Sequence, residues 1–208
     1  MGFRITSTEE IKRDICMKVY GKIEKIFYES SQLIRESTKL SKDIAKAISE
    51  MKNCLERGNK IVVFGNGGSA ADAQHIAGEL IGRFQMERNS LPVIALNTDT
   101  SILTALGNDY SFEIIFSRQC ESLVKKGDLV IGISTSGNSK NVINGLNTSK
   151  QNGAVTLALL GSGGGKIKNI VDVSIIVNSN STPRIQEVHR IIYHIICEHV
   201  EKELMNKK

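Results

Sequence analysis

From residue 60 onward, the chain alternates short apolar runs with stretches of helical length, and this alternation limits the folds open to it. The runs occupy residues 60–65, 92–96, 128–134, 154–161 and 172–177. They are continuous and rich in β-branched residues, which is typical of strands buried on both faces of a sheet. Five strand–helix units in succession predict an α/β fold with a doubly wound, five-stranded parallel sheet.

Residues 9–57 predict a helical extension ahead of this sheet. Apolar residues recur there at helical spacing, Gly21 is the only glycine, and proline is absent. The pattern predicts two amphipathic helices with a break near Ser37 and Thr38. Their apolar faces need a partner, either the body of the domain or another subunit. We therefore divide the chain into a helical region, residues 1–58, and a main domain, residues 59–208, within one structural unit.

Composition and charge argue against several classes of protein. Aromatic residues make up 5% of the chain and tryptophan is absent, which disfavours a base-stacking nucleic-acid surface. The net charge of +5 is scattered along the chain and suits a small anionic substrate. No apolar run approaches the roughly 20 residues that span a bilayer. The four cysteines are widely spaced, as is typical of a reducing compartment. We expect a cytoplasmic protein that binds neither nucleic acid nor membrane.

The loop after the first predicted strand is a candidate ligand site. In doubly wound sheets, ligands bind beyond the carboxyl ends of the strands. Residues 65–69 read Gly-Asn-Gly-Gly-Ser, in which the glycines allow close approach and Asn66 and Ser69 offer hydrogen bonds. The spacing also matches a weak dinucleotide fingerprint, which would require an acidic residue after the second strand. Asn97 stands near that position instead, so a nicotinamide cofactor is disfavoured.

The loop after the third predicted strand has the composition of a phosphate site. Residues 134–139 read Ser-Thr-Ser-Gly-Asn-Ser and precede a predicted helix that begins at Lys140. Hydroxyls together with backbone N–H groups at a helix N-terminus form a cradle for phosphate. The alternative is an ordinary serine cap, for which one hydroxyl would suffice. The loop lacks a Walker lysine, which disfavours hydrolysis of a nucleoside triphosphate.

Two predicted helices carry ionisable residues on one face each. His75 and Glu79 are four residues apart, so they share a face of the helix after the first loop. The last helix has a polar stripe made of Gln186, His189, Arg190, Tyr193 and His194. If the two helices face each other, they offer imidazoles, a carboxylate and an amide that can bind a zinc-like ion, transfer protons, or both. The alternative is that these residues are ordinary surface or core residues.

Four segments together resemble the sugar isomerase (SIS) domain family and, within it, the bacterial phosphoheptose isomerases. They are residues 65–84, 103–119, 132–139 and 184–194, and the resemblance extends over about residues 5–205. It implies a flavodoxin-like SIS fold and an aldose–ketose isomerase. The implied reaction converts sedoheptulose 7-phosphate to D-glycero-D-manno-heptose 7-phosphate through an enediol. The resemblance further implies a homotetramer with its sites at subunit interfaces.

The same resemblance implies roles for individual residues. One zinc ion per subunit would be bound by His75, Glu79, Gln186 and His194, of which Glu79 and His194 would also be the catalytic acid/base pair. The implied substrate contacts are Asn66, Gly67, Gly68, Ser69, Glu79, Asn108, Asp109, Ser134, Thr135, Ser136, Ser139 and Gln186. Pro183 stands where some members of the family carry Ala or Asp, so a role for an acid at that position does not carry over.

Two other functions remain open from the sequence. A related SIS-domain tetramer is not an enzyme and binds the bacterial replication initiator, but it lacks the counterparts of Glu79 and His194, both of which are present here. The chain also resembles isomerases of other sugar phosphates, which act on pentose or hexose phosphates. An assay with ketose phosphates of five, six and seven carbons separates this second alternative from the main hypothesis.

Overall fold

Five parallel strands form a central sheet in the computed structural model, which describes residues 8–205, with side chains from Met17 onward. The strands are β1 (Ile61–Gly65), β2 (Val93–Ala95), β3 (Leu129–Ser134), β4 (Val155–Leu160) and β5 (Val173–Ile176). The helices are α1 (Thr8–Glu36), α2 (Ser41–Glu56), α3 (Gly68–Ile81), α4 (Thr100–Asp109), α5 (Ser117–Leu123), α6 (Lys140–Gln151) and α7 (Thr182–Met205). Each predicted apolar run contains one strand, so the predicted sheet is confirmed.

The strand order places a ligand site between β1 and β3. The order is β2-β1-β3-β4-β5, and every neighbouring pair is parallel. The chain leaves β1 for β2 on one side and then returns to β3 on the other. The order therefore reverses between β1 and β3, which is the position at which ligands bind in doubly wound sheets. The two loops identified from the sequence, residues 65–69 and 134–139, lie at these strand ends.

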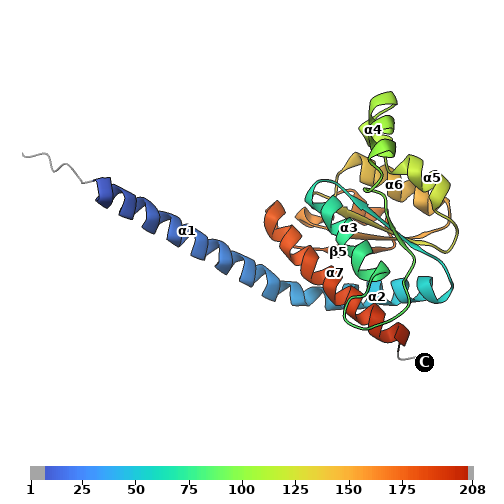
Figure 1. Cartoon of the computed structure of the whole chain (residues 1–208), viewed down its shortest axis with the longest axis horizontal. Coiled ribbons are helices and arrows are strands. Elements are labelled where there is room, and N and C mark those ends of the chain that lie inside the picture. The colour runs from blue at the N-terminus through green and yellow to red at the C-terminus, as the bar shows by residue number, and fades with distance from the viewer. Residues whose placement is uncertain (1–7, 206–208) are drawn as a thin grey trace, which may run out of the picture.

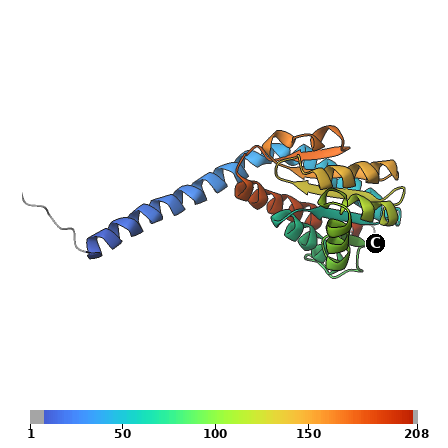
Figure 2. The ribbon, with the colours of Figure 1, turned by 90° about the horizontal axis from the view of Figure 1, so that it is seen from above.

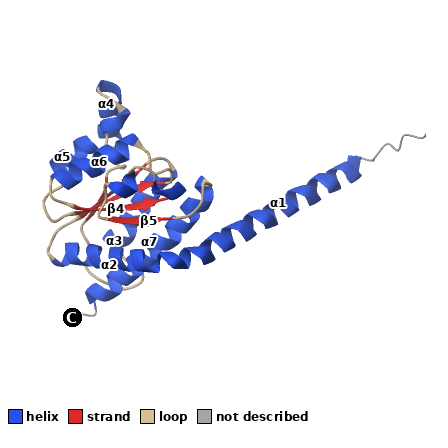
Figure 3. Ribbon diagram, turned by 180° about the vertical axis from the view of Figure 1, so that it is seen from behind, coloured by secondary structure: helices blue, strands red, loops and turns tan. Residues whose placement is uncertain are grey.

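Helices cover both faces of the sheet, as a doubly wound fold requires (Figure 3). Helices α2, α3 and α7 lie on one face, where Val63 and Ile131 belong to their core, and α5 and α6 lie on the other with Phe64. Phe64 stacks on Phe116, with ring centroids 4.7 Å apart. Successive side chains of a strand point to opposite faces, so continuous apolar runs supply both cores.

The N-terminal helices differ in what they bury. A short 3-10 turn at Ser37–Leu40 separates α1 from α2, which confirms the predicted break. Helix α2 packs on the sheet through Ile44, Met51 and three further residues. Helix α1 projects away from the body (Figures 1 and 2), and none of its described side chains is buried. Its exposed apolar side chains are Met17, Val19, Tyr20, Ile23, Ile26, Phe27, Tyr28 and Ile34.

A buried ion pair ties the segment between α3 and β2 to α7. The side chains of Glu201 and Arg88 are 1% and 2% exposed, and Arg88 Nε donates to Glu201 Oε1 at 2.9 Å. Glu201 also accepts from the backbone N–H groups of residues 84, 85 and 86 at 2.8–3.0 Å. Arg88 Nη2 donates to the carbonyl of Glu79 at 3.0 Å. This contact holds the end of α3 on which Glu79 lies.

Helix α4 stands away from the sheet at the opposite end of the molecule from α2 (Figure 1). Its N-cap is Asp99, which accepts from the N–H of Ile102 at 2.9 Å. None of its residues is buried. Among the residues that the structure describes, no helix is both long and apolar enough to cross a bilayer.

Candidate functional site

The loop after β1, residues 65–69, allows another group to approach its backbone closely. Gly67 has φ +55°, which favours glycine, and a Cβ on Gly68 would collide with the side-chain amide of Gln186 on α7. Asn97, two residues after the end of β2, donates to the carbonyl of Gly65 at 2.8 Å and accepts from its N–H at 3.3 Å. The absence of a side chain on Gly68 lets the amide of Gln186 lie against the start of α3.

A pair of asparagines connects this loop to the serine-rich loop. The side-chain amides of Asn66 and Asn141 each donate to the other's oxygen, at 2.8 and 2.9 Å. Asn141 is in the first turn of α6 and is 3% exposed, so its amide is held in place. The sequence reasoning missed Asn97 and Asn141. The signal for Asn97 was its place directly after a strand, whereas nothing in the sequence distinguishes Asn141 from a surface helix residue.

The serine-rich loop gathers its hydroxyls at the N-terminus of α6. Ser134 Oγ lies 3.0 Å from Ser139 Oγ and 3.5 Å from Ser136 Oγ. Ser139 occupies the N-cap position of α6, yet its side chain makes no capping hydrogen bond. The ordinary-cap alternative therefore does not explain the hydroxyls. Together with the N–H groups of the first turn, they form a surface that suits a phosphate group.

A glycine-rich segment, residues 161–165, packs against the serine-rich loop. Gly137 has φ +64°, and a Cβ there would collide with the carbonyl of Gly164. The carbonyl of Gly137 accepts from the N–H of Ile167 at 3.0 Å, and Asn138 Oδ1 accepts from the N–H of Lys166 at 3.1 Å. The two loops thus meet backbone to backbone, which fixes the direction in which the hydroxyls point.

Helices α3 and α7 bring His75, Glu79 and His194 together. One ligand atom from each lies within 4.8 Å of the others. His75 Nε2 is 2.8 Å from Glu79 Oε1 and 3.5 Å from His194 Nε2. The three side chains are half-buried, so solvent and a small molecule can reach them. Helices α3 and α7 face each other in the structure, as was assumed from the sequence.

Burial and neighbouring charge set the protonation of His194. Burial lowers the pKa of His194, the neighbouring His75 lowers it further, and the carboxylate of Glu79 partly opposes both. A lowered pKa favours the neutral imidazole of His194 at neutral pH. A neutral imidazole can bind a metal ion or accept a proton.

The donor set fits a zinc ion. Two imidazole nitrogens bound tetrahedrally at about 2.0–2.1 Å lie about 3.3 Å apart, close to the 3.5 Å between His75 Nε2 and His194 Nε2. Glu79 adds a carboxylate oxygen to the same cluster. Gln186 lies two turns before His194 on α7, with its amide against Gly68 at the start of α3. Nitrogen and oxygen donors in this arrangement are ones that zinc accepts.

Two other residues of the predicted polar stripe, His189 and Tyr193, are buried. His189 is fully buried, and its Nε2 lies 3.0 Å from the carbonyl of Leu160 at the end of β4, so it attaches α7 to the sheet. Tyr193 is 1% exposed, and its hydroxyl lies behind His75, next to the buried carboxylate of Asp72. Burial, followed by the charge of Asp72, raises the pKa of Tyr193 to about 12, so the hydroxyl keeps its proton.

Asn108 and Asp109 are apart from the two loops. Both are exposed at the end of α4, and Asn108 Nδ2 donates to Asp109 Oδ1 at 2.8 Å. Within residues 8–205, no hydrogen bond connects either one to the loops after β1 and β3. Their predicted contact with substrate stays a prediction.

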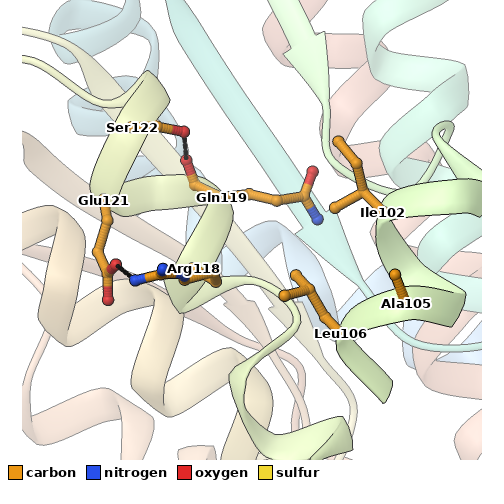
Figure 4. Close-up of a pocket in the computed structure, with 7 residues that line it drawn as sticks. All are labelled: Ile102, Ala105, Leu106, Arg118, Gln119, Glu121 and Ser122. Carbon is orange, nitrogen blue, oxygen red and sulfur yellow. Dashed lines mark hydrogen bonds and ion pairs between the residues drawn. The ribbon is translucent and has the colours of Figure 1, made fainter. Parts of the chain in front are cut away.

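A surface hollow of about 590 Å³ lies between α4 and α5, and none of its lining residues belongs to the loops after β1 and β3 or to the cluster on α3 and α7 (Figure 4). Ile102, Ala105 and Leu106 line it from α4, and four residues of α5 line the other side. Two of these, Arg118 and Glu121, pair with each other at 2.7 Å. The hollow contains neither a loop at a strand end nor a titratable group left without a partner, so it is not the candidate site.

Comparison with known proteins points to one group of enzymes. The model of the SIS domain matches residues 27–161. A phosphoheptose isomerase of Citrifermentans bemidjiense is 56% identical over 168 residues, which are 81% of this chain and 88% of that protein. One from Aquifex aeolicus is 53% identical over 87% of this chain and 95% of that protein. The solved phosphoheptose isomerase of Neisseria gonorrhoeae is 40% identical, with a TM-score of 0.84 over 88% of this chain and 99% of that one.

Proposed function

The chain belongs to the SIS-domain phosphoheptose isomerases, and from this membership we propose that it converts sedoheptulose 7-phosphate to D-glycero-D-manno-heptose 7-phosphate. The enzyme is thus an aldose–ketose isomerase. The observation that carries the mechanism is the meeting of Glu79 and His194, from two separate helices, within one cluster of side chains. The alternative of a non-catalytic tetramer that binds the replication initiator is not favoured, because proteins of that kind lack the counterparts of Glu79 and His194.

The reaction moves one proton between neighbouring carbons and another between the oxygens on them. Glu79 would remove the proton from C1 of the ketose while His194 supports proton transfer at the C2 oxygen, which gives an enediol. Return of a proton to C2 and loss of the proton from the C1 oxygen then give the aldose. A carboxylate and an imidazole placed on one cluster suit these two roles.

His75, Glu79, Gln186 and His194 are the residues that would hold a zinc ion. When bound, zinc polarises a carbonyl as a Lewis acid. Glu79 has two carboxylate oxygens, so one can face the cation while the other faces the C1 proton. The neutral state of His194 is compatible with both binding and proton transfer.

The serine-rich loop would bind the substrate phosphate and set the position of C1 and C2. Ser134, Thr135, Ser136 and Ser139 supply hydroxyls, and the N-terminus of α6 supplies N–H groups. Binding energy at the phosphate then positions the reacting carbons against Glu79. Asn66, Gly67, Gly68, Ser69 and Gln186 would contact the sugar, because their loop lies next to the cluster on α3.

Gly137→Ala tests the phosphate loop. A Cβ at this position collides with Gly164 and meets an unfavourable φ, so we expect the loop to shift and KM to rise about tenfold or more. The control is Gly58→Ala, which has φ +75° but no neighbour within 4 Å and therefore carries the backbone strain alone. Steady-state kinetics of both variants are the measurement, and an unchanged KM in the Gly137 variant would contradict the role of the loop.

Metal analysis combined with kinetics on ketose phosphates of different length tests the proposed function as a whole. We expect the purified protein to contain about one zinc per chain and to turn over the C7 ketose phosphate at least about tenfold more efficiently than C5 and C6 ketose phosphates. Chelation should abolish activity, and added zinc should restore it. A preference for a shorter ketose phosphate, or full activity after complete metal removal, would count against the substrate or the metal respectively.

We further propose a homotetramer in which sites form at subunit interfaces. Two observations support it. Helix α1 exposes eight large apolar side chains, and α4, which carries Asn108 and Asp109, buries none of its residues in the chain itself. A neighbouring subunit would cover these surfaces. A cytoplasmic location stays a prediction from the sequence.

A further inference from the structure

A buried group of polar side chains lies directly behind His75, on the side away from Glu79. The hydroxyl of Tyr193 is 3.0 Å from His75 Nδ1 and 3.3 Å from Asp72 Oδ1. Arg190 Nε also donates to this hydroxyl, at 3.1 Å. Tyr193 and Asp72 are 1% and 2% exposed, so their contacts are made without competition from bulk water.

The state of His75 decides whether it can bind a metal ion. In one state Nε2 carries a proton and donates to Glu79 Oε1, 2.8 Å away, which leaves no lone pair on Nε2 for a cation. In the other state the proton is on Nδ1 and Nε2 is free. That second state needs an acceptor next to Nδ1, and the oxygen of Tyr193 is in place to be that acceptor.

The direction of the hydrogen bonds follows from the chemistry of the three groups. A carboxylate accepts only, so the hydrogen of the Tyr193 hydroxyl points to Asp72 Oδ1. The hydroxyl oxygen then accepts from His75 Nδ1–H. A continuous chain, His75 Nδ1–H to Tyr193 to Asp72, thus connects the imidazole to a buried negative charge.

The burial of Asp72 is otherwise hard to explain. Its Oδ2 has no hydrogen-bond partner among the described residues. The cation nearest to it is Arg190, 3.5 Å away, whose side chain is 56% exposed. Burial of a weakly compensated carboxylate is destabilising, so a purely structural role is a poor account of its presence.

We propose that Tyr193 is a positioning residue that transmits the charge of Asp72 to His75, holds the Nδ1–H tautomer, and thereby makes Nε2 a stronger zinc ligand. Outer partners of metal-bound histidines commonly fix the tautomer and raise ligand basicity. Here a tyrosine stands between the histidine and the carboxylate. The proposal rests on the zinc site of the proposed function.

The test is the zinc affinity of the full-length protein, measured by competition with a chromophoric chelator. Tyr193→Phe removes one oxygen and is expected to weaken zinc binding about 10–100-fold, as loss of such outer partners does. Asp72→Asn is expected to weaken it as well. In the Tyr193→Phe background, Asp72→Asn should add almost nothing, because the connection is already broken. Asp43→Asn, at an exposed position of α2, is the matched control for Asp72→Asn and should bind zinc as the unmodified chain does.

Each result decides something. Unchanged zinc affinity in Tyr193→Phe, or effects of the two substitutions that simply multiply, would overturn the inference and leave the zinc site standing. Absence of zinc binding by the unmodified chain would overturn both. Activity of Tyr193→Phe that recovers at saturating zinc would support a role through the metal site. If Tyr193→Phe does not fold, Asp72→Asn carries the test, and unchanged affinity in that variant overturns the proposal.

Discussion

Glu79→Gln is expected to lower kcat for the C7 ketose phosphate by about 10²–10⁴-fold, the range that general acid–base residues contribute. The substitution keeps the size of the side chain and removes its basicity. Glu79 is half-buried and 2.8 Å from His75, so the amide still fits the same space. The expected loss is therefore chemical, and circular dichroism and the melting temperature should change little.

His194→Ala is the companion variant and should cost about 10²-fold or more in kcat. His199→Ala is its matched control, because His199 is on the same helix and exposed to solvent. Zinc content should be measured for every variant, since Glu79 and His194 are also proposed ligands. Near-normal turnover by both Glu79→Gln and His194→Ala would rule out the catalytic assignment.

Glu201→Gln is expected to lower the free energy of unfolding by about 3–5 kcal/mol, the usual cost of removing one partner from a buried ion pair. The substitution leaves Arg88 buried beside a neutral group. It also turns one of the two acceptor oxygens into an NH₂, which faces backbone N–H donors of residues 84–86. Denaturant unfolding with linear extrapolation measures the change. Glu198→Gln, on the same helix but in a half-exposed ion pair with Lys202, should leave stability almost unaltered.

The same carboxylate predicts an acid dependence of stability. Burial raises the pKa of Glu201, but hydrogen bonds from three N–H groups and the charge of Arg88 outweigh burial and hold the pKa below its ordinary value. A depressed folded pKa means that Glu201 contributes its full stability above its unfolded pKa, about 4.3, and loses it as pH falls through the folded value. Glu201→Gln should flatten this part of the pH profile. An equally steep profile in the variant would assign the acid sensitivity to other groups.

The sheet and the loops could be predicted because strong local patterns specify them. Continuous apolar runs mark strands buried on two faces, and the parallel arrangement fixes which ends carry the ligand loops. The pairing of His75 with Glu79 follows from helical spacing alone. The placement of His194 toward His75 and Glu79 follows from the polar stripe on the last helix, once this helix and the helix after the first loop are assumed to meet.

The rest depends on packing that a single sequence does not specify. His189 and Tyr193 belong to the same stripe as His194, yet both are buried, because the rotation of α7 against the sheet decides which face is inside. Asp72 is one turn before His75 and is buried by the contact between α3 and α7. The prediction for Asn108 and Asp109 came from family resemblance, and the core of one chain does not hold their helix in place.

The projecting helix α1 also affects how the protein melts. At about 1.5 Å per residue, its 29 residues reach about 43 Å, and it meets α7 only near its C-terminal end, where Leu33 packs against the core. Helices in proteins take most of their stability from the packing of an apolar face, so in the proposed homotetramer neighbouring chains would supply most of the order in α1. Folding of α1 and association of chains would then be one linked equilibrium, in which dilution alone would lower the temperature at which the helix is lost.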